Sequence, residues 1–444
     1  LFIILAACDQ IRQIPAGNGY TAKDLCSRVC VQGDDFSRVR DESVAPVVEP
    51  YPDHWYITID YAGRAVEVKD NYGLEPKARA FYREGLGCTV VANGNECTIR
   101  AQSFQPLTPP TLPHDQYWPL GSAGIDPTPA AGVDYARVDS ILSDLVTDRG
   151  QDRTLAALVA YDGQMISERY KSGYDQSSLM TSWSMVKTIS GLLMGALYAD
   201  GHFGIDDRAP VPAWATGAKS AITVRHLMNM TPGLEWIELY TGEGSASQML
   251  FQEGDMSAYV ESLPLEFTPG TNFNYSTGTS TLLGNIVTRL SGGTVQSAHD
   301  FYQTRLFYPI GITNGLIEFD ASGSAVGGAY AHLTTRDWAR LGQLVLQGGN
   351  WNGEQVIPAD WIEFMATPVD VKPSYGGQVW LQSSRMRDFN LPADIVMFRG
   401  FLGQRIAVVP SRNLVMVKLG VHHSDDSGDA VFYAALEQVL NAVP

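Results

Sequence analysis

The chain has 444 residues, of which 45% are hydrophobic and 18% are charged. This composition predicts a globular protein with a large core, and it excludes extended disorder. The formal net charge of −17 argues against nucleic-acid binding, because phosphate backbones would repel so acidic a chain.

The chain begins with an apolar run, Leu1 to Cys8, that is too short to span a bilayer. Its last four residues, Leu5-Ala6-Ala7-Cys8, resemble the cleavage box of a bacterial lipoprotein signal peptide. The resemblance implies a signal-peptide remnant over residues 1–8, lipid on Cys8 and a tether over residues 9–20. The protein would then be exported, periplasmic and anchored to the membrane. The alternative is an ordinary apolar N-terminus in which Cys8 is unmodified.

Residues 21–105 are predicted to form a small α/β domain. A helix is expected from Ala22, turning into a strand that ends at Val31, and residues 55–60 alternate as a strand does. Residues 89–91 and 97–99 flank a turn-forming segment and predict a hairpin. Docking of an envelope protein on this domain is a hypothesis that the sequence leaves open.

Four further cysteines lie in this region: Cys26, Cys30, Cys88 and Cys97. An even number of cysteines in an exported domain predicts two disulfides, and three pairings are open. Zinc is disfavoured because no C-x-x-C pair or neighbouring histidine pair occurs. We therefore expect no metal site.

A proline-rich stretch, residues 106–132, is predicted to be a linker or a strap across the next domain. Residues 133–444 are expected to form one large domain. Its first helix covers residues 135–148, and a strand pair follows, joined by the turn Asp162-Gly163. A matching hairpin and a closing helix occur near the C-terminus, over residues 405–443. Strands at both ends with helices between them predict a sheet closed by both termini.

The sequence Ser184-Met185-Val186-Lys187 opens an unusually apolar helix that ends at Asp200-Gly201. A spacing of three places the serine and the lysine on the same face of the helix. Burial disfavours the ammonium form of lysine, and a neutral lysine can take the proton of a serine hydroxyl. The alternative is a simple helix cap, with Ser182 or Ser184 capping and Lys187 solvated.

Other segments in the same order make the pattern specific. The sequence resembles the serine β-lactamase and penicillin-binding-protein superfamily, and most of all the class C-like branch with 6-aminohexanoate-dimer hydrolases and related esterases. The matching segments are Ser184–Lys187, Ile222–Leu234, Phe267–Gly278, Gly328–Tyr330 and Thr335–Gly342. The resemblance implies an α/β (α+β) fold, in which helices flank an antiparallel sheet and a helical subdomain is inserted, with the small N-terminal α/β domain in addition.

By this resemblance Ser184 is the nucleophile, Lys187 is its base and Tyr275 is a proton relay. The backbone N–H groups of Ser184 and Phe401 would form the oxyanion hole. Residues expected to contact substrate are Trp183, Tyr240, Gly400 and Gln404.

The third motif departs from the lactamase pattern, because Phe398-Arg399-Gly400 replaces a lysine- or histidine-x-glycine. Thr277 also stands where many relatives have asparagine. Both differences point to hydrolysis of a small ester or amide, without a cofactor. A D,D-peptidase or β-lactamase, or a lipid-anchored envelope subunit without turnover, are the alternatives.

Overall fold

A computed structural model describes residues 2–48, 55–70, 77–92, 94–148, 150 and 152–444. The chain forms two compact units, each built from separate segments of the sequence. Unit 1 comprises Leu1–Pro106, Ile205–His299 and Leu316–Tyr330, and unit 2 comprises Leu107–Gly204, Asp300–Gly315 and Ala331–Pro444. In the part of the chain that is described, no helix combines the length and hydropathy needed to cross a membrane.

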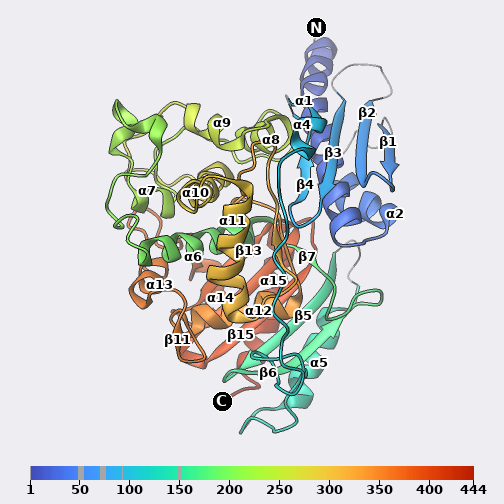
Figure 1. Ribbon diagram of the computed structural model, residues 1–444. Coiled ribbons are helices and arrows are strands. Elements are labelled where there is room, and N and C mark those ends of the chain that lie inside the picture. The colour runs from blue at the N-terminus through green and yellow to red at the C-terminus, as the bar shows by residue number, and fades with distance from the viewer. Residues whose placement is uncertain (1, 49–54, 71–76, 93, 149, 151) are drawn as a thin grey trace. The chain divides into compact units, whose positions relative to one another are not determined.

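Unit 2 is built on a six-stranded antiparallel sheet with the strand order β12-β13-β14-β15-β5-β6 (Figure 1). Its strands are β5 (Arg153–Tyr161), β6 (Gln164–Tyr170), β12 (Trp380–Leu381), β13 (Val396–Gly400), β14 (Gln404–Val409) and β15 (Leu414–Val421). The two predicted hairpins are confirmed as the pairs β5–β6 and β14–β15. The pairing of Leu414 with Tyr161 joins the late strands to the early ones, as predicted.

The sheet of unit 2 is covered by helices on both faces. On one face α5 (Tyr135–Leu145) and α15 (Asp425–Leu440) contribute to a core that includes Leu142, Leu436 and Met416. On the other face lies α12 (Thr335–Leu346). A Cβ added to Gly342 of this helix would lie 2.7 Å from Val415 on β15, so the missing side chain lets the helix backbone approach the strand.

The apolar helix predicted after Ser184 is α6 (Val186–Ala199), and its residues from Val186 to Leu197 are all buried. A Cβ at Gly195 would meet the Trp361 ring of α13 (Ala359–Met365) at 2.5 Å. The Trp361 indole also donates to the Gly191 carbonyl at 2.9 Å. These contacts explain why α6 is apolar on every face. The remaining helix and strands of unit 2 are short: α14 (Ser384–Asp388), β7 (Met180–Thr181), β9 (Ala331–Leu333), β10 (Asn350–Trp351) and β11 (Glu354–Gln355).

The proline-rich stretch is a strap within unit 2. The buried Trp118 donates its indole N–H to the Arg336 carbonyl at 3.2 Å. Arg340 of α12 donates to the carbonyls of Pro119 and Gly121, each at 3.0 Å. Of the two forms that the sequence left open, these contacts select the strap.

Unit 1 contains a four-stranded antiparallel sheet in the order β1-β2-β3-β4 and a set of helices (Figure 1). Its strands are β1 (Trp55–Asp60), β2 (Ala65–Asp70), β3 (Ala78–Arg83), β4 (Gly87–Val90) and β8 (Leu316–Ile317). Its helices are α1 (Phe2–Leu25), α2 (Phe36–Val39), α3 (Ala45–Val48), α4 (Glu96–Arg100), α7 (Val224–Met228), α8 (Ser245–Gln252), α9 (Met256–Ser262) and α10 (Thr277–Leu290). Helix α11 (Val295–Tyr302) follows α10.

In the first hundred residues the tether over 9–20, the strand that ends at Val31 and the strand over 97–99 are wrong. Residues 9–20, expected to be a tether, lie within α1, and the chain stays helical through Val31. Residues 97–99, expected to be a strand, lie in α4, because the Asn95 side chain accepts the Cys97 N–H at 2.8 Å and caps a helix there. Cys8 falls among the residues whose side chains the structure does not describe.

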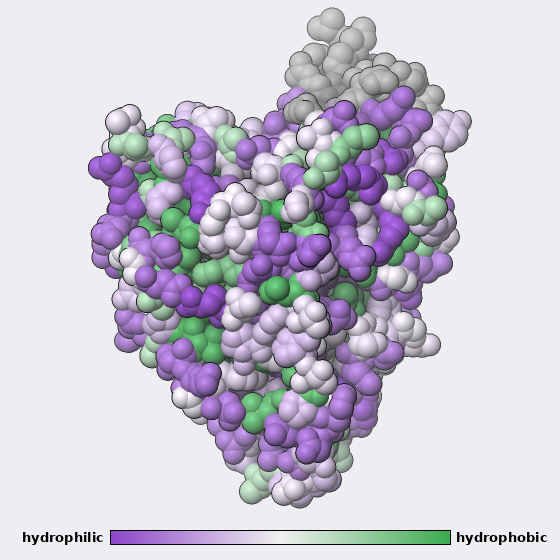
Figure 2. Space-filling view, in the orientation of Figure 1, coloured by the Kyte–Doolittle hydropathy of each residue, from purple (hydrophilic) through white to green (hydrophobic). Residues whose placement is uncertain are grey.

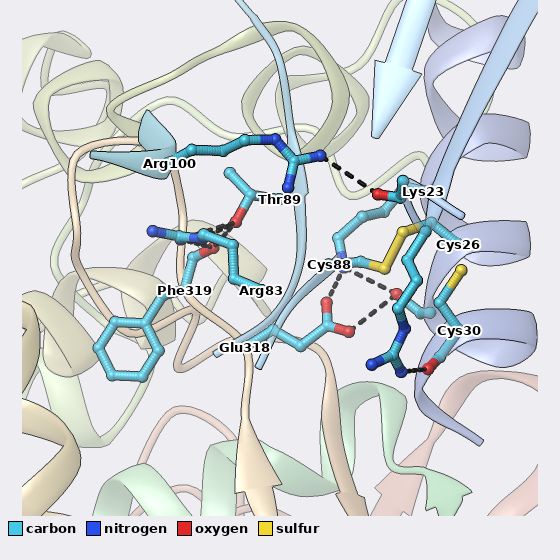
Figure 3. Close-up of a disulfide and its surroundings, with 12 residues drawn as sticks. Lys23, Cys26, Cys30, Arg83, Cys88, Thr89, Arg100, Glu318 and Phe319 are labelled. Atoms are coloured by element: carbon cyan, nitrogen blue, oxygen red, sulfur yellow. Dashed lines mark hydrogen bonds and ion pairs between the residues drawn. A yellow bond between two sulfur atoms is a disulfide. The ribbon is translucent and has the colours of Figure 1, made fainter. Parts of the chain in front are cut away.

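One disulfide forms where two were predicted. Cys26 and Cys88 are bonded, while Cys30 and Cys97 are free thiols. Cys97 is exposed on α4, whereas Cys30 is half-buried in η1 (Cys26–Val31), so the predicted second pair is not made. Figure 3 shows the disulfide beside a buried cluster in which Lys23 pairs with Glu318. Ser27 of this cluster accepts a hydrogen bond from Lys23 at 3.0 Å and donates one to Glu318 at 2.9 Å.

Hydrophilic residues cover much of the face seen in Figure 2, and apolar residues are scattered among them. Only a few large apolar side chains are strongly exposed among the described residues, including Tyr56, Tyr61, Ile237 and Leu239. This distribution is typical of a globular protein.

Candidate active site

The predicted nucleophile lies in a single 3₁₀ turn, η4 (Trp183–Met185), directly before α6. Lys187 lies on the first turn of α6, and its Nζ donates to the Ser184 Oγ at 3.1 Å. Ser184 is 7% exposed and Lys187 is 2% exposed. Lys187 is therefore buried, whereas the helix-cap alternative requires a solvated lysine. No side-chain cap forms at Ser182, which precedes η4, or at Met185, which precedes α6.

The turn that carries Ser184 is held in an unusual backbone conformation. Trp183 has a φ of +45°, which is uncommon for a bulky residue and is found where surrounding contacts compensate for the strain. Those contacts come from Ser182, whose N–H donates to the Ala331 carbonyl and whose Oγ accepts the Ala331 N–H, both at 2.8 Å. The turn is thus fixed to β9, and the direction of Ser184 is set before any substrate binds.

Gly400 ends β13 beside this turn. A Cβ added to Gly400 would lie 2.2 Å from the Ser182 carbonyl oxygen, so only glycine allows this approach. Phe401 follows, and its ring packs edge-on against Trp183 with centroids 5.1 Å apart. The structure therefore brings five predicted residues together in unit 2: Trp183, Ser184, Lys187, Gly400 and Phe401. Trp183 is 2% exposed.

Gln404 has a different environment from the one expected of a substrate contact. Its amide N–H₂ donates to the carbonyls of Leu402 at 2.9 Å and Gly420 at 2.6 Å. Its carbonyl accepts the Gly420 N–H at 3.1 Å, and the side chain is buried. These bonds tie the turn after Gly400 to β15, so the geometry supports a role in shaping the Phe401 turn.

The third motif carries no free cationic group. Phe398 is buried in β13, and Arg399 pairs with Asp429 at 2.7 Å. The same carboxylate accepts a hydrogen bond from Arg405 at 2.6 Å. Arg399 is thus directed to α15, where it shares the Asp429 carboxylate with Arg405.

Tyr275 and Tyr240 lie in unit 1. Tyr275 directly precedes Ser276, whose side chain accepts the Thr279 N–H and caps α10. Tyr240 donates its phenol O–H to Glu238 at 2.9 Å. Glu238 also accepts a hydrogen bond from the Thr277 hydroxyl. Glu238 was not predicted from the sequence, because a single glutamate in a loop belongs to no motif. The alternation of Trp236, Glu238 and Tyr240 was the available signal.

His226 takes part in a capping box at the start of α7. Its N–H donates to the Thr223 hydroxyl and its Nδ1 accepts the Thr223 N–H. Burial lowers the pKa of His226. No set of three or more histidine, cysteine, aspartate or glutamate side chains suited to a metal ion occurs among the residues that the structure describes.

An antiparallel sheet with helices on both faces, and a buried helix that begins at an S-x-x-K motif, define a β-lactamase-like fold. The family model described as Beta-lactamase matches residues 138–438, and the chain therefore belongs to the β-lactamase family.

Individual relatives agree with this assignment. The chain is 26% identical over 323 residues to the 6-aminohexanoate-dimer hydrolase of Paenarthrobacter ureafaciens, which covers 66% of this chain and 79% of the relative. A solved family VIII carboxylesterase matches with a TM-score of 0.55 and 17% identity over 71% of this chain and 99% of its own. A novel penicillin-binding protein homolog from Caulobacter crescentus matches with a TM-score of 0.53 and 18% identity, over 72% and 99%. At these identities the two structures show the fold alone.

Proposed function

We propose that this chain is a serine hydrolase that cleaves ester or amide bonds through an acyl-enzyme on Ser184. The hydrogen bond from Lys187 to Ser184, at 3.1 Å between two buried side chains, is the observation that carries the proposal. A base in contact with a hydroxyl nucleophile is the arrangement that nucleophilic catalysis requires. The name of one relative, a 6-aminohexanoate-dimer hydrolase, supports assignment to the hydrolases.

In the first half-reaction the Ser184 Oγ attacks the substrate carbonyl carbon while Lys187 takes the hydroxyl proton. The negative charge on the carbonyl oxygen is stabilised by the backbone N–H groups of Ser184 and Phe401. The intermediate collapses, the leaving group departs with a proton relayed by Tyr275, and an acyl-enzyme remains. Water then attacks the ester with the same groups in reverse roles, which restores Ser184 and releases the acid.

The substrate class follows from the third motif. A β-lactam or a D-alanyl peptide presents a carboxylate, which a basic side chain would bind. Phe398 is apolar and buried, and Arg399 is paired with Asp429. We therefore place small acyl esters first and short amide oligomers second.

Labelling with a fluorophosphonate tests the nucleophile. The wild-type chain should be modified at Ser184, and Ser184→Ala should abolish both the labelling and the hydrolysis of p-nitrophenyl esters. Ser190→Ala is the matched control, because Ser190 is a buried serine on the same helix α6. Unlabelled wild-type protein, or undiminished labelling of Ser184→Ala, would exclude the proposal.

A panel of substrates then tests the class. Hydrolysis of short acyl esters, with an amide dimer next and a chromogenic cephalosporin last, is the expected order. Turnover of the cephalosporin above the esters would instead identify a penicillin-recognising enzyme.

A further inference from the structure

The residues from Trp236 to Tyr240 form a segment of unit 1 whose side chains alternate between two sides. Ile237 and Leu239 are exposed, at 49% and 50%, while Trp236 is buried. Glu238 and Tyr240, on the same side as Trp236, are partly buried. A carboxylate on the inner side of such a segment needs hydrogen-bond donors.

The Glu238 carboxylate receives four donors. Its Oε1 accepts from the Tyr240 phenol at 2.9 Å and from the Thr277 hydroxyl. Its Oε2 accepts from the Trp236 indole at 2.6 Å and from the Thr277 N–H at 2.8 Å. The Thr277 N–H belongs to the first residue of α10, where the helix dipole favours a negative charge.

The segment from Trp236 to Tyr240 forms hydrogen bonds with the chain on both sides of Tyr275. Before it, the Asn274 amide donates to the Trp236 carbonyl at 3.0 Å. After it, Thr277 is bound through its N–H and its hydroxyl by Glu238. One residue further on, a Cβ added to Gly278 would lie 2.4 Å from the Trp236 ring, so the indole lies directly on the start of α10.

We propose that Glu238 is a positioning residue for the reaction: it fixes the backbone on which Tyr275 is held and orients the phenol of Tyr240. This inference rests on the proposed function, in which Tyr275 relays the leaving-group proton and Tyr240 contacts substrate. Glu238 acts through these two tyrosines and through Thr277. A glutamine cannot replace it, because its N–H₂ group would face donors at one of the two oxygen positions.

Three variants test the inference in the full chain. Glu238→Gln should lower kcat/KM for the best ester roughly 10- to 100-fold, the scale expected when reacting groups are misplaced by about 1 Å. Glu238→Asp, which keeps the charge, should recover part of the loss. Glu243→Gln, at an exposed position in the same loop, is the matched control and should retain wild-type turnover.

The rate of Ser184 labelling by a fluorophosphonate separates positioning from general damage. Fluoride leaves without a protonated tyrosine, so labelling of Glu238→Gln should stay within about threefold of wild type while ester turnover falls further. Thr277→Val, which removes one donor to Glu238, should lower turnover too, and the double variant Glu238→Gln/Thr277→Val should lose less than the sum of the single effects.

Amide hydrogen exchange over residues 274–281 supplies a readout that does not depend on turnover. The Thr277 N–H should exchange faster in Glu238→Gln than in wild type or in Glu243→Gln. Unchanged exchange, or a Glu238→Gln variant with turnover within twofold of wild type, would overturn the inference. Wild-type protein that is not labelled at Ser184 would contradict the proposed function instead, and the exchange measurement would still decide whether Glu238 holds the start of α10.

Discussion

Gly400 shows how a single missing side chain can define a site. A Cβ added to Gly400 would lie 2.2 Å from the Ser182 carbonyl oxygen, which is shorter than any van der Waals contact. The carbonyl oxygen belongs to the backbone and the Cβ would be bonded to it, so neither atom is the end of a flexible side chain. Neither β13 nor the Ser184 turn can give way easily, because Ser182 is held by two hydrogen bonds to Ala331. The glycine therefore sets how closely the strand that leads to Phe401 can approach the nucleophile turn.

We expect Gly400→Ala to fold and to lose most of its activity. The methyl group must push β13 away from the Ser182 carbonyl, and misplacement on the scale of 1 Å costs about 100-fold in rate. The measurement is kcat/KM for the best ester, with thermal unfolding to verify the fold. Gly94→Ala is the control, because its Cβ would meet no atom closer than 3.4 Å. Wild-type activity in Gly400→Ala would show that the close approach has no catalytic role.

Asp24 is a second residue whose environment leads to a prediction. It is fully buried on α1, and within the described part of the chain neither carboxylate oxygen has a hydrogen-bond partner. Burial raises the pKa of Asp24 from 3.8 to about 6, although Arg28 and Lys23 oppose the shift. Because the pKa of Asp24 is raised in the folded state, the contribution of Asp24 to stability is complete below pH 3.8. This contribution is lost as the pH rises through about 6.

Asp24→Asn removes this titration. The free energy of unfolding of the variant, relative to wild type, should rise between pH 4 and pH 8 by up to about 3 kcal/mol. Urea unfolding at the two pH values measures the difference. Asp115→Asn, at an exposed position, should show no such change. A difference between Asp24→Asn and wild type that is the same at both pH values would contradict the assigned burial effect.

At the scale of the element, the two hairpins of unit 2 were predicted correctly, while the hairpin expected over residues 89–99 was wrong. The Asp162-Gly163 turn between β5 and β6 combines two residues that both adopt positive φ, and this requirement is visible in the sequence itself. The sequence before Cys97–Ile99 carries a similar pair, Asn93-Gly94, but the Asn95 cap made the triplet part of a helix. Short apolar runs suit either structure, so a neighbouring cap decides between them.

The end of α1 and the start of η1 are held in unit 1 by a disulfide and by an ion pair. The disulfide links Cys26 to Cys88 on β4 across 62 residues of sequence, and both cysteines are buried. The paired Lys23 and Glu318 lie beside it (Figure 3). Covalent and ionic contacts therefore hold the same stretch of helix.

Cys88→Ser should lower the free energy of unfolding by about 2–4 kcal/mol, because the open chain regains the entropy that the closed loop lacked. Cys26→Ser should have a similar effect, and the double variant should add little to either. Cys97→Ser, an exposed free thiol, is the control. Equal denaturation midpoints for Cys88→Ser and Cys97→Ser under non-reducing conditions would show that the disulfide contributes nothing.

At the scale of the whole molecule, the compact units do not follow the order of the chain. Unit 1 combines the first 106 residues with two later segments. A Cβ added to Gly19 of α1 would lie 2.5 Å from the Phe251 Cβ on α8, and Tyr20 packs edge-on against the Phe251 ring. Arg83 of β3 donates to the Phe319 carbonyl at 3.1 Å. The N-terminal region is therefore part of a shared core.

A fragment of residues 107–444 should not reproduce the fold of the intact chain. It would expose Phe251 and leave Glu318 buried without Lys23, and an unpaired buried charge is strongly destabilising. We expect rapid proteolysis of the later unit 1 segments and loss of ester turnover, with the intact chain as the control. A fragment with wild-type protease resistance and turnover would show that residues 1–106 form a detachable module.

The sequence by itself determined the S-x-x-K pair, the two hairpins, the buried helix after Ser184 and the closure of the sheet by both termini. Each of these depends on spacing or periodicity within a short stretch, where local geometry dictates which side chains share a face. The tertiary structure decided the engagement of Gln404 with backbone groups, the contact of Gly400 with Ser182, the pairing of Arg399 with Asp429 and the two hydrogen bonds from Thr277 to Glu238. These contacts join segments far apart in the chain or reverse the expected direction of a side chain, so they depend on the path of the whole backbone.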